Sequence, residues 1–110
     1  MTRVKICAAF AAAAIVTSLP SFADCTLPPP PSKIPNGSTA SEQEMLAAMN
    51  TLKEYNGDVS VYLKCLDYEV KQNRMASSLR DVKNNSAVTE LQSIADKFNQ
   101  QVRAFKAKHG

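Results

Sequence analysis

Between Ser41 and Val70 the chain has no proline, and its apolar side chains recur at intervals of three, four and seven residues. These intervals match the repeat of an α-helix, so they place the apolar side chains on one helical face. Such a face must be covered by another part of the molecule. No stretch of the chain shows the alternating apolar and polar pattern of a β-strand. The apolar seam is formed by Met45, Met49, Leu52, Val59, Leu63, Leu66 and Val70.

One short segment, Asn56-Gly57-Asp58, could interrupt this helix. Glycine costs about 1 kcal/mol in a helix interior, and Asn-Gly is a common helix stop. The seam nevertheless keeps its seven-residue phase from Leu52 through Val59 to Leu66. We therefore predict one continuous helix, with a break at Asn56-Gly57 as the alternative.

The two ends of the predicted helix have different signals. Asn36-Gly37 is typical of a turn, and Ser41 followed by Glu44 fits a capping box, so the helical region should begin near residue 39. After Val70 the apolar phase slips, although Met75, Leu79 and Val82 continue a stripe. The helix is expected to run to about Lys83, with the course of residues 71–83 left open.

Asn84-Asn85-Ser86 is the predicted turn, because asparagine suits a left-handed helix stop and serine suits an N-cap. A second, shorter helix should follow from about Ala87 to Ala107. The predicted fold class is all-α: an antiparallel helical hairpin over residues 39–110, with a long first helix and a shorter second one.

Residues 1–23 have the pattern of a secretory signal peptide. Arg3 and Lys5 precede an apolar run over residues 6–16, and Ser21 and Ala23 suit the cleavage site. That run is shorter than the roughly 20 residues that span a bilayer. We expect export to the periplasm or the medium, with no stable membrane insertion after cleavage. Loss of this segment lowers the net charge from +3 to +1, which does not favour nucleic acid as a partner.

Cys25 and Cys65 are the cysteines that remain after cleavage. In an oxidising compartment they predict an intramolecular disulfide, with free thiols or an intermolecular bridge as alternatives. Residues 24–38 are rich in proline and favour polyproline II. Extended back along the first helix, such a strap covers about 40 Å and reaches Cys65. Leu27 and Ile34 should then lie against the helix; a disordered linker is the alternative.

The same region carries a resemblance to known proteins. Its elements are Cys25, the prolines through Pro35, Asn36-Gly37-Ser38-Thr39-Ala40, Glu44-Met45, Tyr55 and Val61-Tyr62-Leu63-Lys64-Cys65-Leu66. They resemble small exported helical proteins of Gram-negative bacteria with a Cys-Pro-rich N-terminus and a Tyr-Leu-x-Cys helix. The resemblance covers residues 25–66 and implies an exported, disulfide-bonded protein, but no substrate, cofactor or catalytic residue. Such proteins often have aspartate where this chain has Asn36, and either residue suits the turn.

No catalytic or metal-binding set is apparent in the sequence. His109, the single histidine, is next to the last residue, which leaves no positioned imidazole for triad or zinc chemistry. The carboxylate pairs Asp67/Glu69 and Glu42/Glu44 are expected on solvated helix faces. Met45 and Met49 could hold copper(I), but core packing is favoured. We expect no enzyme activity, no cofactor and no metal; an enzyme that uses surface carboxylates or tyrosines is the remaining alternative.

The candidate interaction surface consists of Tyr55, Tyr62, Tyr68, Lys71 and Arg74. The tyrosines could form an exposed aromatic stripe, although packing of Tyr55 and Tyr62 against the proline strap is the favoured interpretation. A basic region, Lys71, Arg74, Arg80 and Lys83, could meet an acidic partner or a membrane surface, with a solvated face favoured.

These features predict a small, exported, non-enzymatic helical protein. Its expected partner is another protein or an envelope component. A periplasmic chaperone or an enzyme inhibitor that uses an amphipathic helix face is the alternative. Two helices alone make a thin core, so homodimerisation is a further hypothesis.

Overall fold

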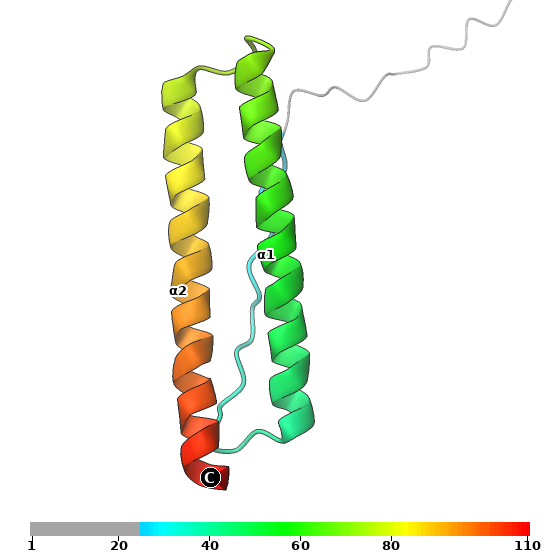
Figure 1. The fold of residues 1–110 in the computed structure, drawn as a ribbon, viewed down its shortest axis with the longest axis vertical. Coiled ribbons are helices and arrows are strands. Elements are labelled where there is room, and N and C mark those ends of the chain that lie inside the picture. Colours follow the sequence, from blue (N-terminus) through cyan, green and yellow to red (C-terminus); the bar gives the residue numbers. More distant parts are fainter. Residues whose placement is uncertain (1–24) are drawn as a thin grey trace, which may run out of the picture.

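The structure, a computed structural model, describes residues 25–110 as an antiparallel pair of helices with an extended strap (Figure 1). Helix α1 spans Glu42–Lys71, 30 residues, and helix α2 spans Ser77–His109, 33 residues. The predicted all-α hairpin is confirmed, and α1 runs without a break through Asn56-Gly57. The predicted signal peptide, residues 1–23, lies outside the described residues.

The capping box at the start of α1 is formed as predicted. The Glu44 backbone N–H donates to Ser41 Oγ at 3.1 Å, and the Ser41 backbone N–H donates to Glu44 Oε2 at 2.8 Å. Together they satisfy two of the backbone donors that have no partner within the helix. Glu42 and Glu44 also place negative charge at the positive end of the helix dipole.

The predicted position of the turn is wrong. Helix α1 ends at Lys71, and the residue in the left-handed region is Asn73, with φ 57°. The Arg74 N–H donates to the Glu69 carbonyl at 2.9 Å and the Asn73 N–H to the Val70 carbonyl at 3.0 Å. These two bonds form a Schellman motif. The slip in apolar phase after Val70 therefore marks the end of the first helix.

Residues 84–86, predicted as the turn, lie within α2, and α2 is the longer helix. Asn85 and Ser86 are exposed, so neither competes for space in the core, while the neighbouring Ala87 is buried against α1. Packing of this helix face outweighs the weak local preference of asparagine and serine for turns.

The strap, of which the structure describes residues 25–38, is bonded to α1 by the predicted disulfide between Cys25 and Cys65, whose Cα atoms are 5.7 Å apart. Half-buried residues recur along it every third position, at Cys25, Pro28, Pro31 and Ile34. This is the repeat of polyproline II, which has three residues per turn. Leu27 is out of this phase and is 56% exposed, so the expectation that it lies against the helix is wrong. Ile34 contacts the core as predicted.

At its other end the strap is tied to α2. The Gly37 backbone N–H donates to Gln101 Oε1 at 2.9 Å. Gly37 is buried, and a Cβ atom there would overlap the backbone carbonyl of Gln101. Only glycine permits this close approach of the two backbones.

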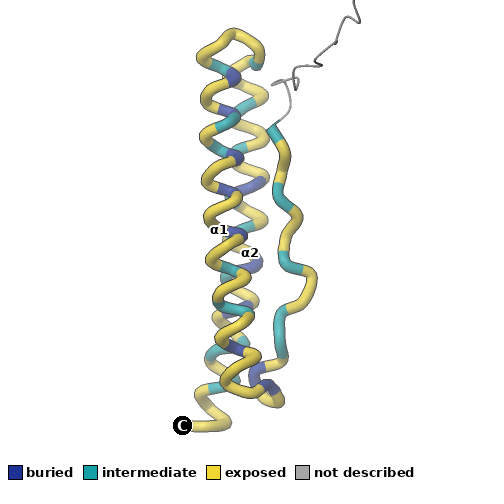
Figure 2. Tube along the Cα trace, turned by 90° about the vertical axis from the view of Figure 1, so that its right-hand side faces the viewer, coloured by how far each residue is buried: buried dark blue, intermediate teal, exposed yellow. Residues whose placement is uncertain are grey.

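The strap covers one face of the hairpin and leaves the opposite face bare, as Figure 2 shows with α1 and α2 seen edge on. We call these the strap face and the open face. The core between the helices has two adjoining clusters, joined by Ile34 and Leu52. Their buried members are Tyr55, Val59, Tyr62, Leu66, Ala87 and Ile94 in one cluster, and Ala40, Met45 and Phe98 in the other.

Candidate binding surface

Three side chains form a row along α1 near the disulfide: Val61, Cys65 and Tyr68. Their spacing of four and three residues places them on one side of the helix. Val61 is 67% exposed and Tyr68 is 53% exposed, while Cys65 between them carries the disulfide. We call this row the turn-end stripe. It is an exposed apolar and aromatic surface on an otherwise polar side of the helix.

A shallow groove of about 350 Å³ lies beside the stripe. The strap contributes Pro28 to its wall, and α1 contributes Asp58, Val61 and Tyr62, with the two bonded cysteines between them. The disulfide thus brings proline and tyrosine side chains from distant parts of the sequence to one surface. Proline-rich segments dock on aromatic side chains in several peptide-binding domains, and here the proline and the tyrosine belong to the same chain.

Arg74 fixes the outer end of the stripe. Its Nε donates to Glu69 Oε2 at 2.8 Å and its Nη2 donates to Glu69 Oε1 at 2.9 Å. The same guanidinium lies over the Tyr68 ring, 5.5 Å from the ring centroid. A planar guanidinium can make a bidentate contact and an aromatic contact at once, which an ammonium group cannot. Tyr68 is therefore exposed but held in position.

The charges at this site neutralise each other. Hydrogen bonds from Arg74 hold the pKa of the Glu69 carboxyl below its usual range, although burial acts in the opposite direction. The bond to Glu69 in turn raises the pKa of Arg74 further above its ordinary value. The pair is therefore ionised across the physiological pH range, and its net charge is zero. The surface around Tyr68 presents an aromatic ring and not a strong positive field.

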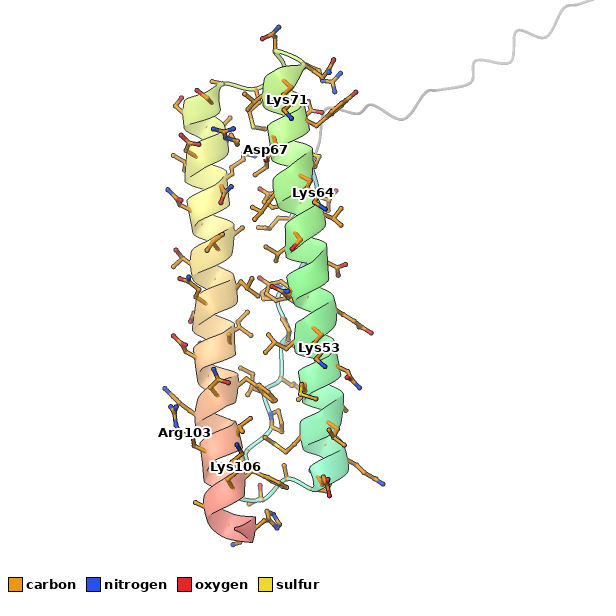
Figure 3. All side chains as sticks on the ribbon, viewed as in Figure 1. Lys53, Lys64, Asp67, Lys71, Arg103 and Lys106 are labelled. Carbon is orange, nitrogen blue, oxygen red and sulfur yellow. A yellow bond between two sulfur atoms is a disulfide. The ribbon has the colours of Figure 1, made fainter. Side chains whose placement is uncertain are left out.

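The structure brings together three of the five residues predicted as an interaction surface. Tyr68, Lys71 and Arg74 lie at the turn end of α1, and Figure 3 shows Lys71 there. Tyr55 and Tyr62 are only 4% and 6% exposed, so an exposed stripe is wrong for these two. Both pack in the core with Cys25 and Ile34 of the strap, which is the favoured alternative. Burial, and then the Glu90 carboxylate, raises the pKa of Tyr55.

The predicted basic region does not form one patch. Lys71 ends α1, Arg74 lies in the turn, and Arg80 and Lys83 belong to α2. Arg80 pairs with Asp67 at 3.2 Å, which joins the two helices, and with Asp81 at 3.0 Å. With Arg74 paired to Glu69 as well, two of the four cations are neutralised.

Sequence reasoning missed the role of Glu69. It was expected on a solvated face, but it is 1% exposed and is the one buried charged residue of the described chain. Its partner lies beyond the helix end, five positions later, so no helical spacing indicated the pair. Asp67 is exposed, as expected, and Met45 and Met49 pack in the core.

Within residues 25–110, no group of three or more histidine, cysteine, aspartate or glutamate side chains is placed to hold a metal ion. His109 stacks on Phe105, with ring centroids 4.2 Å apart. Neither α1 nor α2 is apolar enough along its length to cross a membrane. What the described surface offers is an apolar and aromatic area suited to contact with another molecule.

Comparisons with protein-family models, with curated proteins and with solved structures give no match to this chain.

Proposed function

We propose that this chain is a small exported protein without enzymatic activity that binds another protein or an envelope component through the turn-end stripe. One observation carries the proposal: Tyr68 is half exposed and yet fixed by Arg74, which Glu69 holds in turn. Fixed tyrosine and arginine side chains are enriched at the centres of protein interfaces, because little side-chain entropy is lost when a partner binds.

The disulfide supports the assignment to an oxidising compartment, since such bonds are rare in the cytosol. It also supports the binding role, because it holds Pro28 beside Val61 and so builds the groove next to the stripe. The proposed partner contributes an apolar or aromatic side chain to this groove.

A site-specific crosslink tests the proposal. A photoreactive phenylalanine analogue is placed at position 68, at position 61 or, as a control, at Val82, which is 66% exposed on α2. Irradiation is carried out in intact cells that express the full chain. We expect one discrete product at positions 61 and 68 and none at position 82. Protease treatment of the product distinguishes a protein partner from a lipid or glycan.

Absence of a discrete product at both stripe positions, or the same products at position 82, would contradict the proposal. Arg74→Gln provides a second readout when the analogue is at position 61, because it frees the Tyr68 ring without removing it. We expect this variant to weaken the crosslink at position 61 while leaving the disulfide intact.

A further inference from the structure

The open face carries apolar side chains that nothing in the described chain covers. Two shallow grooves follow it, of about 380 and 240 Å³, and neither contains a residue of the strap. One is lined by Leu52, Leu91 and Ala95 near the middle of the hairpin. The other is lined by Met49, Phe98, Val102 and Phe105 toward the open end. Figure 3 shows Lys53 and Lys106 beside this face, with the strap passing behind.

The dimensions of the open face match a stable dimer. A helix of 30 residues is about 45 Å long, and two helices side by side are about 20 Å wide. Such a face has a projected area of about 900 Å², so a partner that covered all of it would form a contact of standard size, roughly 800 Å² for each partner. A partner that covers the whole face must itself be long and flat, and a second hairpin has that shape.

Asn56 indicates how two copies would be aligned. It is the one polar position in the α1 seam, lies at the midpoint of Glu42–Lys71 and lines the central groove. When two copies of α1 pack antiparallel about a two-fold axis near their midpoints, Asn56 meets its own copy. A side-chain amide both donates and accepts, so the two amides can pair with each other. A single buried asparagine is a known way to set helix register.

The charges at the ends of α1 agree with the same alignment. Glu42 lines the groove at the open end. Lys71 is 18 residues after Lys53, which is five helical turns, so both lysines lie on one side of α1. In an antiparallel pair centred on Asn56, Glu42 of each copy lies beside Lys71 of the other. The two opposite charges therefore meet twice in one dimer.

We infer that the open face binds a second copy of this chain, with α1 on α1 and α2 on α2, antiparallel, about a two-fold axis near Asn56. The result is a four-helix bundle with the two straps on its outer faces. This surface is separate from the turn-end stripe, so the inference stands or falls independently of the proposed binding function. In the dimer both turn-end stripes remain exposed, one at each end of the bundle.

Sedimentation equilibrium of the oxidised, processed protein, expressed as the full chain, tests this inference. Ala95→Glu places a charge in the central groove, and Val82→Glu places the same charge on an exposed position away from it. We expect a dimer for the wild type and for Val82→Glu. Dimer affinity should fall on the order of a hundredfold for Ala95→Glu, because two unpaired charges would be buried. Circular dichroism checks that each variant is folded.

A charge exchange tests the alignment without a change in the core. Glu42→Lys and Lys71→Glu each bring like charges together twice, and each should weaken the dimer on the order of tenfold. The double variant restores opposite charges in the antiparallel dimer, so its affinity should return toward that of the wild type. Failure of the double variant to recover would overturn the alignment.

A protein that stays monomeric at about 1 mM would overturn the inference, as would a dimer unaffected by Ala95→Glu. Binding of the monomer to anionic lipid vesicles, or to a reduced and unfolded polypeptide, with loss on Ala95→Glu, would assign the open face to a membrane or to a chaperone role instead. Loss of the crosslink at position 68 without change in the dimer would concern only the proposed function.

Discussion

Arg74 and Glu69 form a bidentate ion pair across the end of α1, with hydrogen bonds of 2.8 and 2.9 Å, although the Glu69 residue is 1% exposed. The same two residues share a backbone bond in the Schellman motif, where an apolar contact is usual. Here a charge pair takes the place of that contact. The pair therefore links the helix stop, the position of Tyr68 and the start of the turn.

Arg74→Gln should destabilise the protein more than the double variant Glu69→Gln/Arg74→Gln. The single variant leaves a buried carboxylate without its cation, whereas the double variant leaves two neutral groups that can still bond. Urea unfolding monitored by circular dichroism measures both. Arg80→Gln, which breaks more exposed pairs, is the control and should have a small effect. Equal losses for the single and double variants would show that the ion pair does not act as a unit.

The Glu69 pair also predicts how stability depends on pH. Because the pKa of Glu69 is lower in the folded protein, its contribution is fully present above the ordinary glutamate value of about 4.3. It is lost as the pH falls below that value, since the unfolded chain binds the proton more readily. Unfolding in urea from about pH 7 to pH 3 should show this loss. The loss of stability on acidification should be smaller in Glu69→Gln than in the wild type. An equal loss in the two proteins would assign the pH dependence to other carboxyl groups.

Removal of the disulfide should cost about 4 kcal/mol in the free energy of unfolding, because the bond closes a loop with a sequence separation of 40. The variant Cys25→Ser/Cys65→Ser tests this by urea unfolding. Mass spectrometry provides the direct check: reduction of the wild type should add two hydrogens. No change in mass on reduction would mean that the bond does not form.

Two glycines should respond to alanine in opposite directions. Gly57 is exposed within α1, and a Cβ there has open space, so Gly57→Ala should stabilise the protein by about 0.5–1 kcal/mol. Gly37→Ala should destabilise it, because the new methyl group would overlap the Gln101 carbonyl and push the strap away from α2. Thermal unfolding of both variants makes the comparison. A stabilising Gly37→Ala would show that the strap does not dock there.

Helix α2 begins without a side-chain cap. Ala76 occupies the N-cap position in an extended conformation, and no side chain accepts from the first turn. Ala76→Asp should therefore stabilise the protein by about 1 kcal/mol, by capping and by its charge near the helix dipole. Ala76→Asn, which caps without the charge, separates the two effects. If neither variant raises the midpoint of thermal unfolding, the helix does not begin at this residue.

Much of the fold could be predicted from local patterns. Three features depend on residues whose identity and spacing are sufficient evidence. They are the capping box at Ser41 and Glu44, the continuous helix through Gly57, and the pairing of Cys25 with Cys65. The turn was predicted at residues 84–86, whereas the left-handed residue after α1 is Asn73. The slip in apolar phase after Val70 is the sequence signal that agrees with the observed helix end.

The candidate binding surface was predictable in part. Tyr68, Lys71 and Arg74 come together because they follow one another across a helix end, but the spacing could not show that Tyr55 and Tyr62 turn inward. The pair of Glu69 and Arg74 depends on the left-handed turn at Asn73, which brings the arginine back over the helix end. The three-residue repeat of the strap, which exposes Leu27, follows from the polyproline II geometry that its prolines favour.

The sequence alone determined that this chain makes two amphipathic helices and a proline strap held by one disulfide, because helix periodicity, proline and cysteine act through local geometry and covalent chemistry. Only the tertiary structure decided where the first helix stops, which tyrosines are buried, and that the strap covers one face of the hairpin while the other stays open. Those outcomes depend on which apolar side chains cover each other across the two helices, and that is a property of their packing and not of any single segment.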